Sequence, residues 1–317
     1  MIILHNKQTE KHNPSPDGEG SYRVKDFIET VSDEQIKDMM PLVETEINFT
    51  HSPRHKQKMK GACKSKCQVA EASLTKVSYD AMLTSVALAI MAADQNAFAI
   101  TRPPGHHAIK ERAQGLCFFN NIAIATSYLL RKGKRVCIVD IDGHHGNGTQ
   151  SIFKKNENVL YCSIHQEYVY PYSSGLVDDI GSGRSFKKVI NIPLKAGSGD
   201  DIFINSLEFL SQHIKKFAPD YIAISAGFDG YAKDTILELG YSKNGYYQAG
   251  KLLSSLSLPT FAVLEGGYHK EVRECVQSFV AGFSGDEFSF SDKLSTSSIE
   301  CKNKNSLILK TLSGLLG

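Results

Sequence analysis

The chain has 317 residues, 41% of them hydrophobic and 22% charged, so it can bury one large core or two modest ones. Its 36 basic and 34 acidic residues give a formal net charge of +2, which excludes a global electrostatic attraction to nucleic acid or to an anionic membrane. The seven cysteines are odd in number and irregularly spaced, so they do not match a secreted disulfide framework and favour a reducing cytosol.

Residues 1–95 are predicted to form a loop- and helix-rich entrance region. Its first residues are too poor in apolar side chains for a signal peptide, so we expect a cytoplasmic protein, with delivery to another cell by a different route left open. Residues 5–20 contain Pro14, Pro16 and two glycines and predict a long loop, which we place at the mouth of the site because such loops are often functional. Helices are predicted at 33–47 and 79–94.

From about residue 97 onward, short apolar runs alternate with longer amphipathic stretches, which is typical of a parallel sheet flanked by helices. The runs are nearly continuous, as burial on both faces of a strand requires, and lie at 97–101, 136–140, 159–164, 189–192, 221–225 and 260–264. Helices are predicted between them at 121–131, 148–155, 202–217 and 246–255. Polar surface follows at 284–305, with a closing helix at about 306–316, and we expect one domain over 1–317.

Polar segments that contain glycine follow four of these strands, at 102–107, 142–148, 227–229 and 265–268. In open parallel α/β sheets the carboxyl ends of the strands form the edge at which ligands bind. The sequence therefore predicts that four loops converge on one rim, and it predicts no apolar run of about 18 residues that could cross a membrane.

The segment 139–148 has acidic and histidine side chains at alternate positions as it leaves a buried strand. Alternate positions share one face of a strand, so Asp142 and His144 can bind the same ion, and this pair suits Zn²⁺ or Fe²⁺ better than Mg²⁺ or Ca²⁺. Asp229 also follows an apolar strand directly and could be the third ligand that a catalytic zinc site needs. The alternatives are structural, namely a strand-end aspartate with surface histidines and, for Asp229, a helix N-cap.

Two further segments place reactive groups at the same rim. His106 and His107 follow another strand in a stiff Pro/Gly turn. The two histidines can have different roles if their partners differ, because a carboxylate raises the pKa of a histidine and a neutral amide does not. Asp140 and Asn147 are candidate partners of that unequal kind. A glycine pair presents Tyr268, whose phenol can hydrogen-bond the oxyanion formed when water attacks an amide beside a metal. Taken singly, structural histidines and a structural tyrosine are the alternatives.

The strings RPPGHHA, GLCFFNNIAIA, VDIDGHHGNGTQ, SAGFDGYAKD and LEGGYH, in this order and spacing, closely resemble class II histone deacetylases and their bacterial relatives in the superfamily that includes the acetylpolyamine amidohydrolases. SAGFD and LEGGYH are nearer to the deacetylases than to the acetylpolyamine amidohydrolases. The resemblance covers about 97–270. It implies the arginase/deacetylase-like three-layer α/β fold, with helices flanking a mostly parallel sheet of about eight strands. It also implies a zinc-dependent amidohydrolase that removes acetyl or related acyl groups from lysine side chains of proteins or peptides, with an acetylpolyamine or other small acylamine as the alternative substrate.

The resemblance further implies roles for individual residues. One Zn²⁺ per chain would be held by Asp142, His144 and Asp229. The groups that act on the substrate would be the general base and acid His107, its electrostatic assistant His106 and the carbonyl-polarising Tyr268. Their buried partners would be Asp140 and Asn147. A structural K⁺ or Na⁺ would be bound through side chains or backbone carbonyls of Asp140, Asp142, His144, Ser163 and Ile164.

The substrate tunnel departs from the family pattern. Family members usually wall it with two aromatic rings, whereas here Leu116 replaces the first and Tyr170 is the candidate for the second, so a bulkier acyl group or a different amine can fit. Polyamine-selective relatives carry an acidic rim residue where this chain has Ile236, with Glu238 nearby, which favours lysine in a peptide. The predicted tunnel residues are Gly115, Leu116, Tyr170, Ile236 and Gly267.

Residues 51–66 contain six basic residues and no acidic one, which indicates a solvated face or, alternatively, a docking patch for an acidic partner. The same region could bind a second, structural zinc through His51, His55, Cys63 and Cys67.

A ureohydrolase such as arginase is the rival enzyme, but it needs two bridged Mn²⁺ ions and more aspartates than this rim offers. A non-catalytic binding protein is disfavoured because a candidate for every ligand, base and oxyanion donor is present. The oligomeric state stays open.

Overall fold

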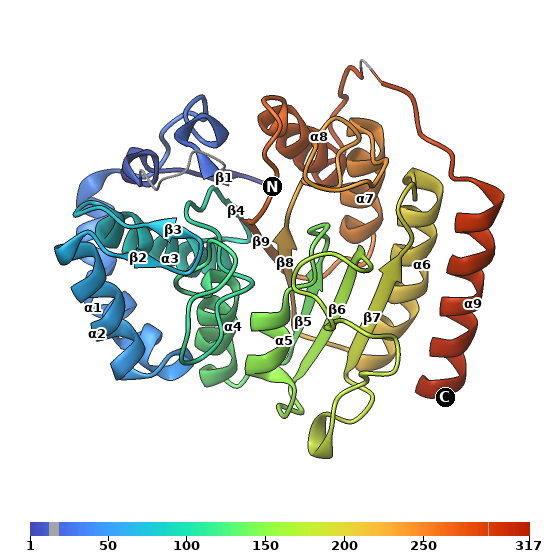
Figure 1. The fold of residues 1–317 in the computed structure, drawn as a ribbon, viewed down its shortest axis with the longest axis horizontal. Helices are drawn as coiled ribbons and strands as arrows, with labels where there is room; N and C mark the ends of the chain where they lie inside the picture. The colour runs from blue at the N-terminus through green and yellow to red at the C-terminus, as the bar shows by residue number, and fades with distance from the viewer. Residues whose placement is uncertain (13–18, 291) are drawn as a thin grey trace.

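Seven parallel strands form the central sheet in the described residues, 1–12, 19–290 and 292–317, of a computed structural model (Figure 1). In spatial order they are β1 (Ile3–Leu4), β4 (Phe98–Ala99), β9 (Thr260–Leu264), β8 (Tyr221–Ala226), β5 (Val136–Asp140), β6 (Val159–Gln166) and β7 (Val189–Leu194). Every neighbouring pair is parallel. The predicted parallel sheet is therefore confirmed, with seven strands rather than about eight, and β1 is a strand that the apolar pattern did not predict.

Each face of the sheet has its own hydrophobic core, because successive side chains of a strand point to opposite faces. Ile138 belongs to one core and its neighbour Val139 to the other. Burying one such side chain fully stabilises the folded state by about 1.5–3 kcal/mol. The continuous apolar runs therefore require a layer of helices on both faces.

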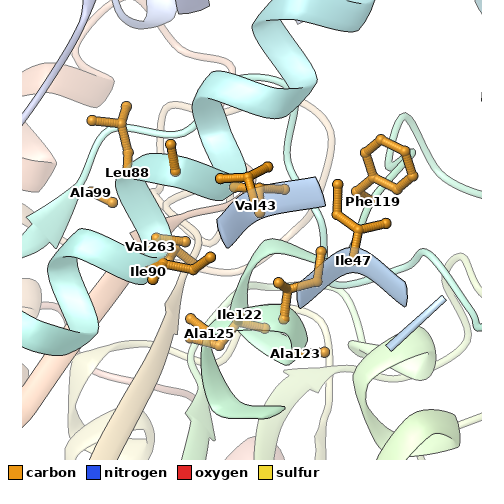
Figure 2. Close-up of a cluster of buried hydrophobic side chains, with 14 of the residues drawn as sticks. Val43, Ile47, Leu88, Ile90, Ala99, Phe119, Ile122, Ala123, Ala125 and Val263 are labelled. Atoms are coloured by element: carbon orange, nitrogen blue, oxygen red, sulfur yellow. The ribbon is translucent and has the colours of Figure 1, made fainter. Parts of the chain in front are cut away.

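Two sets of helices supply these layers, and Figure 1 shows them on opposite sides of the sheet. The first core is covered by α1 (Asp33–Thr50), α3 (Ser78–Gln95), α4 (Asn121–Arg131) and α5 (Asn147–Phe153). The second is covered by α6 (Asp200–Phe217), α7 (Lys243–Ser254), α8 (Val272–Ser284) and α9 (Ile299–Leu316). Figure 2 shows side chains of α1, α3 and α4 gathered over strand residues of β4 and β9. No helix in the described chain combines the length and hydropathy needed to cross a bilayer.

Two of these helices differ from the prediction. The helix α8 was not predicted, although its buried residues have helical spacing, namely Val272, Cys275, Val276 and Phe279. The closing helix α9 begins at Ile299, inside the segment predicted as polar surface. Ser298 caps it by accepting the Cys301 N–H at 3.2 Å, so the helix starts where the cap allows and not where its apolar residues become frequent.

The basic segment forms a helix that was also not predicted, α2 (Pro53–Ser65). Ser52 caps this helix by accepting the His55 N–H at 3.1 Å. Its buried side chains are spaced four residues apart and are His55, Met59 and Cys63, whereas Lys58, Lys60 and Lys64 are exposed. The run of basic residues is therefore the solvent face of an amphipathic helix.

The predicted second zinc site is wrong. The Nε2 atom of His51 accepts the Asn120 N–H at 2.9 Å, and its Nδ1 atom bonds the Ile109 carbonyl at 3.1 Å, so the backbone uses both ring nitrogens. Cys63 is buried but Cys67 is exposed. Within the described ranges, the side chains proposed for this zinc do not converge as metal ligands.

A small antiparallel hairpin follows α2 and consists of β2 (Gln68–Val69) and β3 (Ala72–Ser73). Its tip is formed by Ala70, which has the left-handed φ of +51°, and by the exposed Glu71. The hairpin therefore projects a carboxylate into solvent at a point that the sequence analysis left unassigned.

The N-terminal segment predicted as a loop at 5–20 contains a short 3-10 helix, η1 (Lys7–Lys11), and leads into η3 (Ser21–Arg23). Pro14 and Pro16, on which the loop prediction depended, lie outside the described residues. Glu19 is buried, and it lines the cavity described below. The end of this segment therefore lies at the site.

The order of the strands predicts where a ligand binds. From β5 the chain continues to β6 on one side of the sheet, whereas from β8 it continues to β9 on the other side, although β5 and β8 are neighbours. In open α/β sheets the crevice beyond the carboxyl ends at such a switch point is the usual ligand site. Asp142 and Asp229 follow these two strands.

Candidate active site

Three candidate ligands meet beyond the carboxyl ends of β5 and β8. Ligand atoms of Asp142, His144 and Asp229 all lie within 4.8 Å of one another. The Nδ1 atom of His144 is 2.7 Å from Asp229 Oδ2 and 3.4 Å from Asp142 Oδ1. The structure thus brings together side chains that are up to 87 positions apart (229 minus 142).

Glycines make the space for the two carboxylates. A Cβ atom at Gly227 would lie 1.8 Å from Asp142 Oδ2, and one at Gly266 would lie 2.3 Å from Asp229 Oδ2. The N–H of Gly266 also donates to Asp142 Oδ2 at 2.7 Å. Any side chain at these positions would displace the carboxylates. Glycine at both positions therefore leaves room for the carboxylates and for a small ligand that they could bind.

The donor set fits a divalent metal ion. Asp142 and Asp229 are both fully buried, and no lysine or arginine of the described chain pairs with either of them. Burial, together with the charge of Asp142, raises the pKa of Asp229 to about 6. The partners of these carboxylates among the described residues include the imidazoles of His106 and His144 and the backbone N–H groups of Gly143 and Gly266. Two carboxylates with one imidazole are ligands that Zn²⁺ accepts.

The paired histidines have the unequal partners predicted from the sequence. His106 Nδ1 lies 3.2 Å from Asp140 Oδ2, and His107 Nδ1 lies 2.8 Å from Asn147 Oδ1. Burial lowers the pKa of His106, but the charges of Asp142 and Asp140 outweigh burial and raise it to about 10. Burial lowers the pKa of His107 well below its usual value, and the neighbouring His106 adds to this effect. Because an amide oxygen only accepts, Nδ1 of His107 carries the hydrogen and Nε2 is left as a base.

A cavity of about 300 Å³ opens from this cluster to the surface. It is lined by Glu19, Glu71, His107, Gly115, Leu116, His144, Tyr170, Ile236 and Tyr268. Burial raises the pKa of Tyr268 well above its usual value, so the phenol keeps its proton and can donate a hydrogen bond. A candidate metal ligand, a candidate base and a hydrogen-bond donor therefore share one cavity.

Comparison with known families adds to this geometry. The histone deacetylase domain family matches residues 20–283, which is most of the chain. The chain belongs to that family. A protein named "Probable deacetylase" from Methanothermobacter thermautotrophicus is 32% identical over 309 residues, which is 91% of this chain and 92% of that protein.

Other relatives of this histone deacetylase family member match over a shorter length. An acetylpolyamine amidohydrolase from Burkholderia pseudomallei is 40% identical over 190 residues, which is 59% of this chain and 56% of that protein. The chain therefore spans little more than half the length of this relative. The crystal structure of the HDA15 HD domain has the same fold, with a TM-score of 0.84 and 23% identity over 99% of this chain and 94% of that one.

The predicted tunnel residues do not all line the cavity. Gly115 lies at the wall, where a Cβ would come within 2.5 Å of the His107 ring, and Leu116, Tyr170 and Ile236 line it as well. Gly267 lies behind the wall, because its carbonyl accepts from Arg23 Nε at 2.6 Å and a Cβ there would meet Val272. Glu238 is not at the cavity either.

The residues predicted to bind a monovalent cation are adjacent in this histone deacetylase fold. Asp140 on β5 and Ser163 on β6 are register partners, and Ile164 follows Ser163. The Asp140 carboxylate accepts the Asp142 N–H and the Tyr161 hydroxyl, each at 3.2 Å. Binding of K⁺ or Na⁺ at this place stays a proposal.

Three acidic residues at the site escaped the sequence analysis. Glu265 Oε2 accepts the N–H groups of Gly105 at 2.6 Å and His106 at 3.0 Å, so it holds the backbone of the histidine pair. Glu19 lines the cavity and pairs with Arg23 at 2.7 Å. Glu71 reaches the cavity from the hairpin. Glu265 belongs to the LEGGYH string and could have been found there. Glu19 lies in the loop predicted at the site mouth but was not singled out, and no local signal connects Glu71 with the site.

Proposed function

We propose that this chain hydrolyses the amide bond of an acylated amine and uses one Zn²⁺ held by Asp142, His144 and Asp229. When bound, this ion would lower the pKa of a water molecule and polarise the acyl carbonyl. The observation that carries the proposal is the single cavity that joins His144 of the ligand set to His107 and Tyr268. Membership of the histone deacetylase domain family supports it and disfavours the ureohydrolase alternative.

The side chains divide the proton transfers between them. His107, whose Nδ1 is bonded to Asn147, takes a proton from the attacking water at Nε2 and later delivers a proton to the departing amine. His106, whose ring lies 4.0 Å from that of His107, assists electrostatically. Tyr268 donates its hydroxyl hydrogen to the oxyanion of the tetrahedral intermediate, and one such donor is typically worth about 2.7–4 kcal/mol.

The substrate that these features favour is a small acylated amine that carries a free ammonium group. Glu71 is exposed at the cavity, and no basic side chain in the described part of the chain forms an ion pair with it. Several relatives bear the name acetylpolyamine amidohydrolase. An acyl-lysine in a peptide is the second candidate, supported by the apolar Ile236, which is 50% exposed where the cavity opens.

The test is an activity panel with zinc-loaded protein, comparing acetylated polyamines with acetyl-, propionyl- and longer acyl-lysine peptides. Tyr268→Phe should lose roughly 10²–10³ in kcat while its zinc content stays unchanged. Absence of hydrolysis of every acylated amine would overturn the proposed function. Turnover by Tyr268→Phe close to that of the wild type would overturn the role of the phenol alone.

A further inference from the structure

Asp234 connects two loops of the site through one buried carboxylate. Its Oδ2 atom accepts the N–H of Tyr268 at 2.5 Å and the N–H of His269 at 3.0 Å. Its Oδ1 atom accepts the N–H of Ile236 at 3.2 Å. Asp234 is only 5% exposed, and within the described ranges no lysine or arginine forms an ion pair with it. Backbone N–H groups therefore stabilise its charge.

Tyr268 needs such support because of the residues that precede it. Two glycines come before it, and Gly267 has a φ of +113°. Glycine adopts this backbone conformation readily, but it adopts many others as well, so the glycines by themselves do not fix the position of Tyr268. On the carbonyl side, Arg23 donates to the Gly267 oxygen at 2.6 Å, and the Tyr22 hydroxyl donates to the Tyr268 oxygen at 2.7 Å. Both of these contacts come from the N-terminal segment.

The contact made by Asp234 has a different origin. Asp234 lies five positions after Asp229, in the loop that follows β8, whereas Tyr268 lies in the loop that follows β9. The Asp234 carboxylate thus links the loop that carries the candidate metal ligand Asp229 to the backbone of Tyr268. The same carboxylate holds the backbone of Ile236, which lines the cavity beside Tyr268.

We propose that Asp234 is a positioning residue, which fixes the Tyr268 phenol relative to the loop that carries Asp229. This inference rests on the proposed amide hydrolysis. In Asp234→Asn, an amide NH₂ group replaces one acceptor oxygen in front of backbone N–H donors, so at least one of these hydrogen bonds is lost. Misplacement of a catalytic group by about 1 Å costs up to about 10²-fold in rate, so kcat should fall by about 10- to 100-fold.

A double-mutant cycle with Tyr268→Phe tests this role. If Asp234 acts through the phenol, Asp234→Asn should lower kcat strongly in the wild-type background but by less than about twofold in the Tyr268→Phe background. KM should change less than kcat, and the zinc content should not change. Equal losses in the two backgrounds would overturn the proposal.

The matched control is Asp200→Asn. Asp200 is also buried and accepts backbone N–H groups, those of Ser242 at 2.9 Å and Ser295 at 2.7 Å, but it does not line the cavity. Its variant should lose stability and keep the wild-type kcat. If Asp234→Asn does not fold, Asp234→Glu, which keeps the charge, decides the matter in the same cycle. A wild-type protein that hydrolyses no acylated amine would instead refute the proposed function, so the two failures are distinguishable.

Discussion

Replacing Glu71 by glutamine should lower the activity of the protein on acylated amines that carry a free ammonium group. Glu71 lies at the tip of the β2–β3 hairpin, beside the half-buried Tyr170, and lines the cavity. Burial raises the pKa of Tyr170, and the negative charge of Glu71 raises it further. A monoacetylated diamine with its acetyl group at the cavity floor would hold its free ammonium toward this carboxylate.

The size of the effect follows from the exposure of Glu71. Two unit charges 4 Å apart interact by about 1 kcal/mol in water and by about 4 kcal/mol at an effective dielectric constant of 20. Because Glu71 is exposed to solvent, the lower value applies. A loss of about 1 kcal/mol corresponds to a roughly fivefold fall in kcat/KM, and most of it should be an increase in KM.

The assay compares N-acetylputrescine with N-butylacetamide, which has the same carbon chain and no charge. Glu71→Gln should lower kcat/KM for the first compound alone, and the difference should disappear as the ionic strength rises from about 0.01 M to about 1 M. Glu208→Gln is the matched control, since Glu208 is exposed on α6 and does not line the cavity. An equal loss on both compounds, or a loss independent of salt, would refute the role assigned to Glu71.

Two other predictions concern the tunnel wall and the pH dependence of stability. Leu116→Phe should restore a ring face and raise kcat/KM for acetyl-lysine relative to longer acyl-lysines, and an unchanged ratio in competition assays would count against this. Burial, with the nearby His55, lowers the pKa of His51 to about 3, so below pH 6.5 the unfolded chain binds a proton that the folded chain does not, and stability falls with falling pH. His51→Gln should reduce this decline by up to about 1.4 kcal/mol per pH unit between pH 6 and 4 in denaturant titrations, whereas parallel curves for the two proteins would contradict it.

Local patterns in the sequence were sufficient to predict most of the sheet. The strands from β4 to β9 were predicted because their side chains are buried on both faces, and burial of this kind leaves an apolar run that can be read without a structure. The helix α2 was missed for the opposite reason. Its lysines dominate the composition, and its three buried side chains are too widely spaced to stand out in a basic segment.

The sequence by itself determined the parallel α/β class and the residue types at the rim, because strand burial and the loops that follow strands are properties of neighbouring residues. Tertiary structure alone decided that Glu71 reaches the cavity, that Glu238 and Gly267 do not line it, and that His51 is held by backbone groups. Each of these outcomes depends on contacts between segments far apart in the chain. Which distant segments come into contact depends on how the layers of helices and strands pack, and this cannot be predicted from a local pattern of residues.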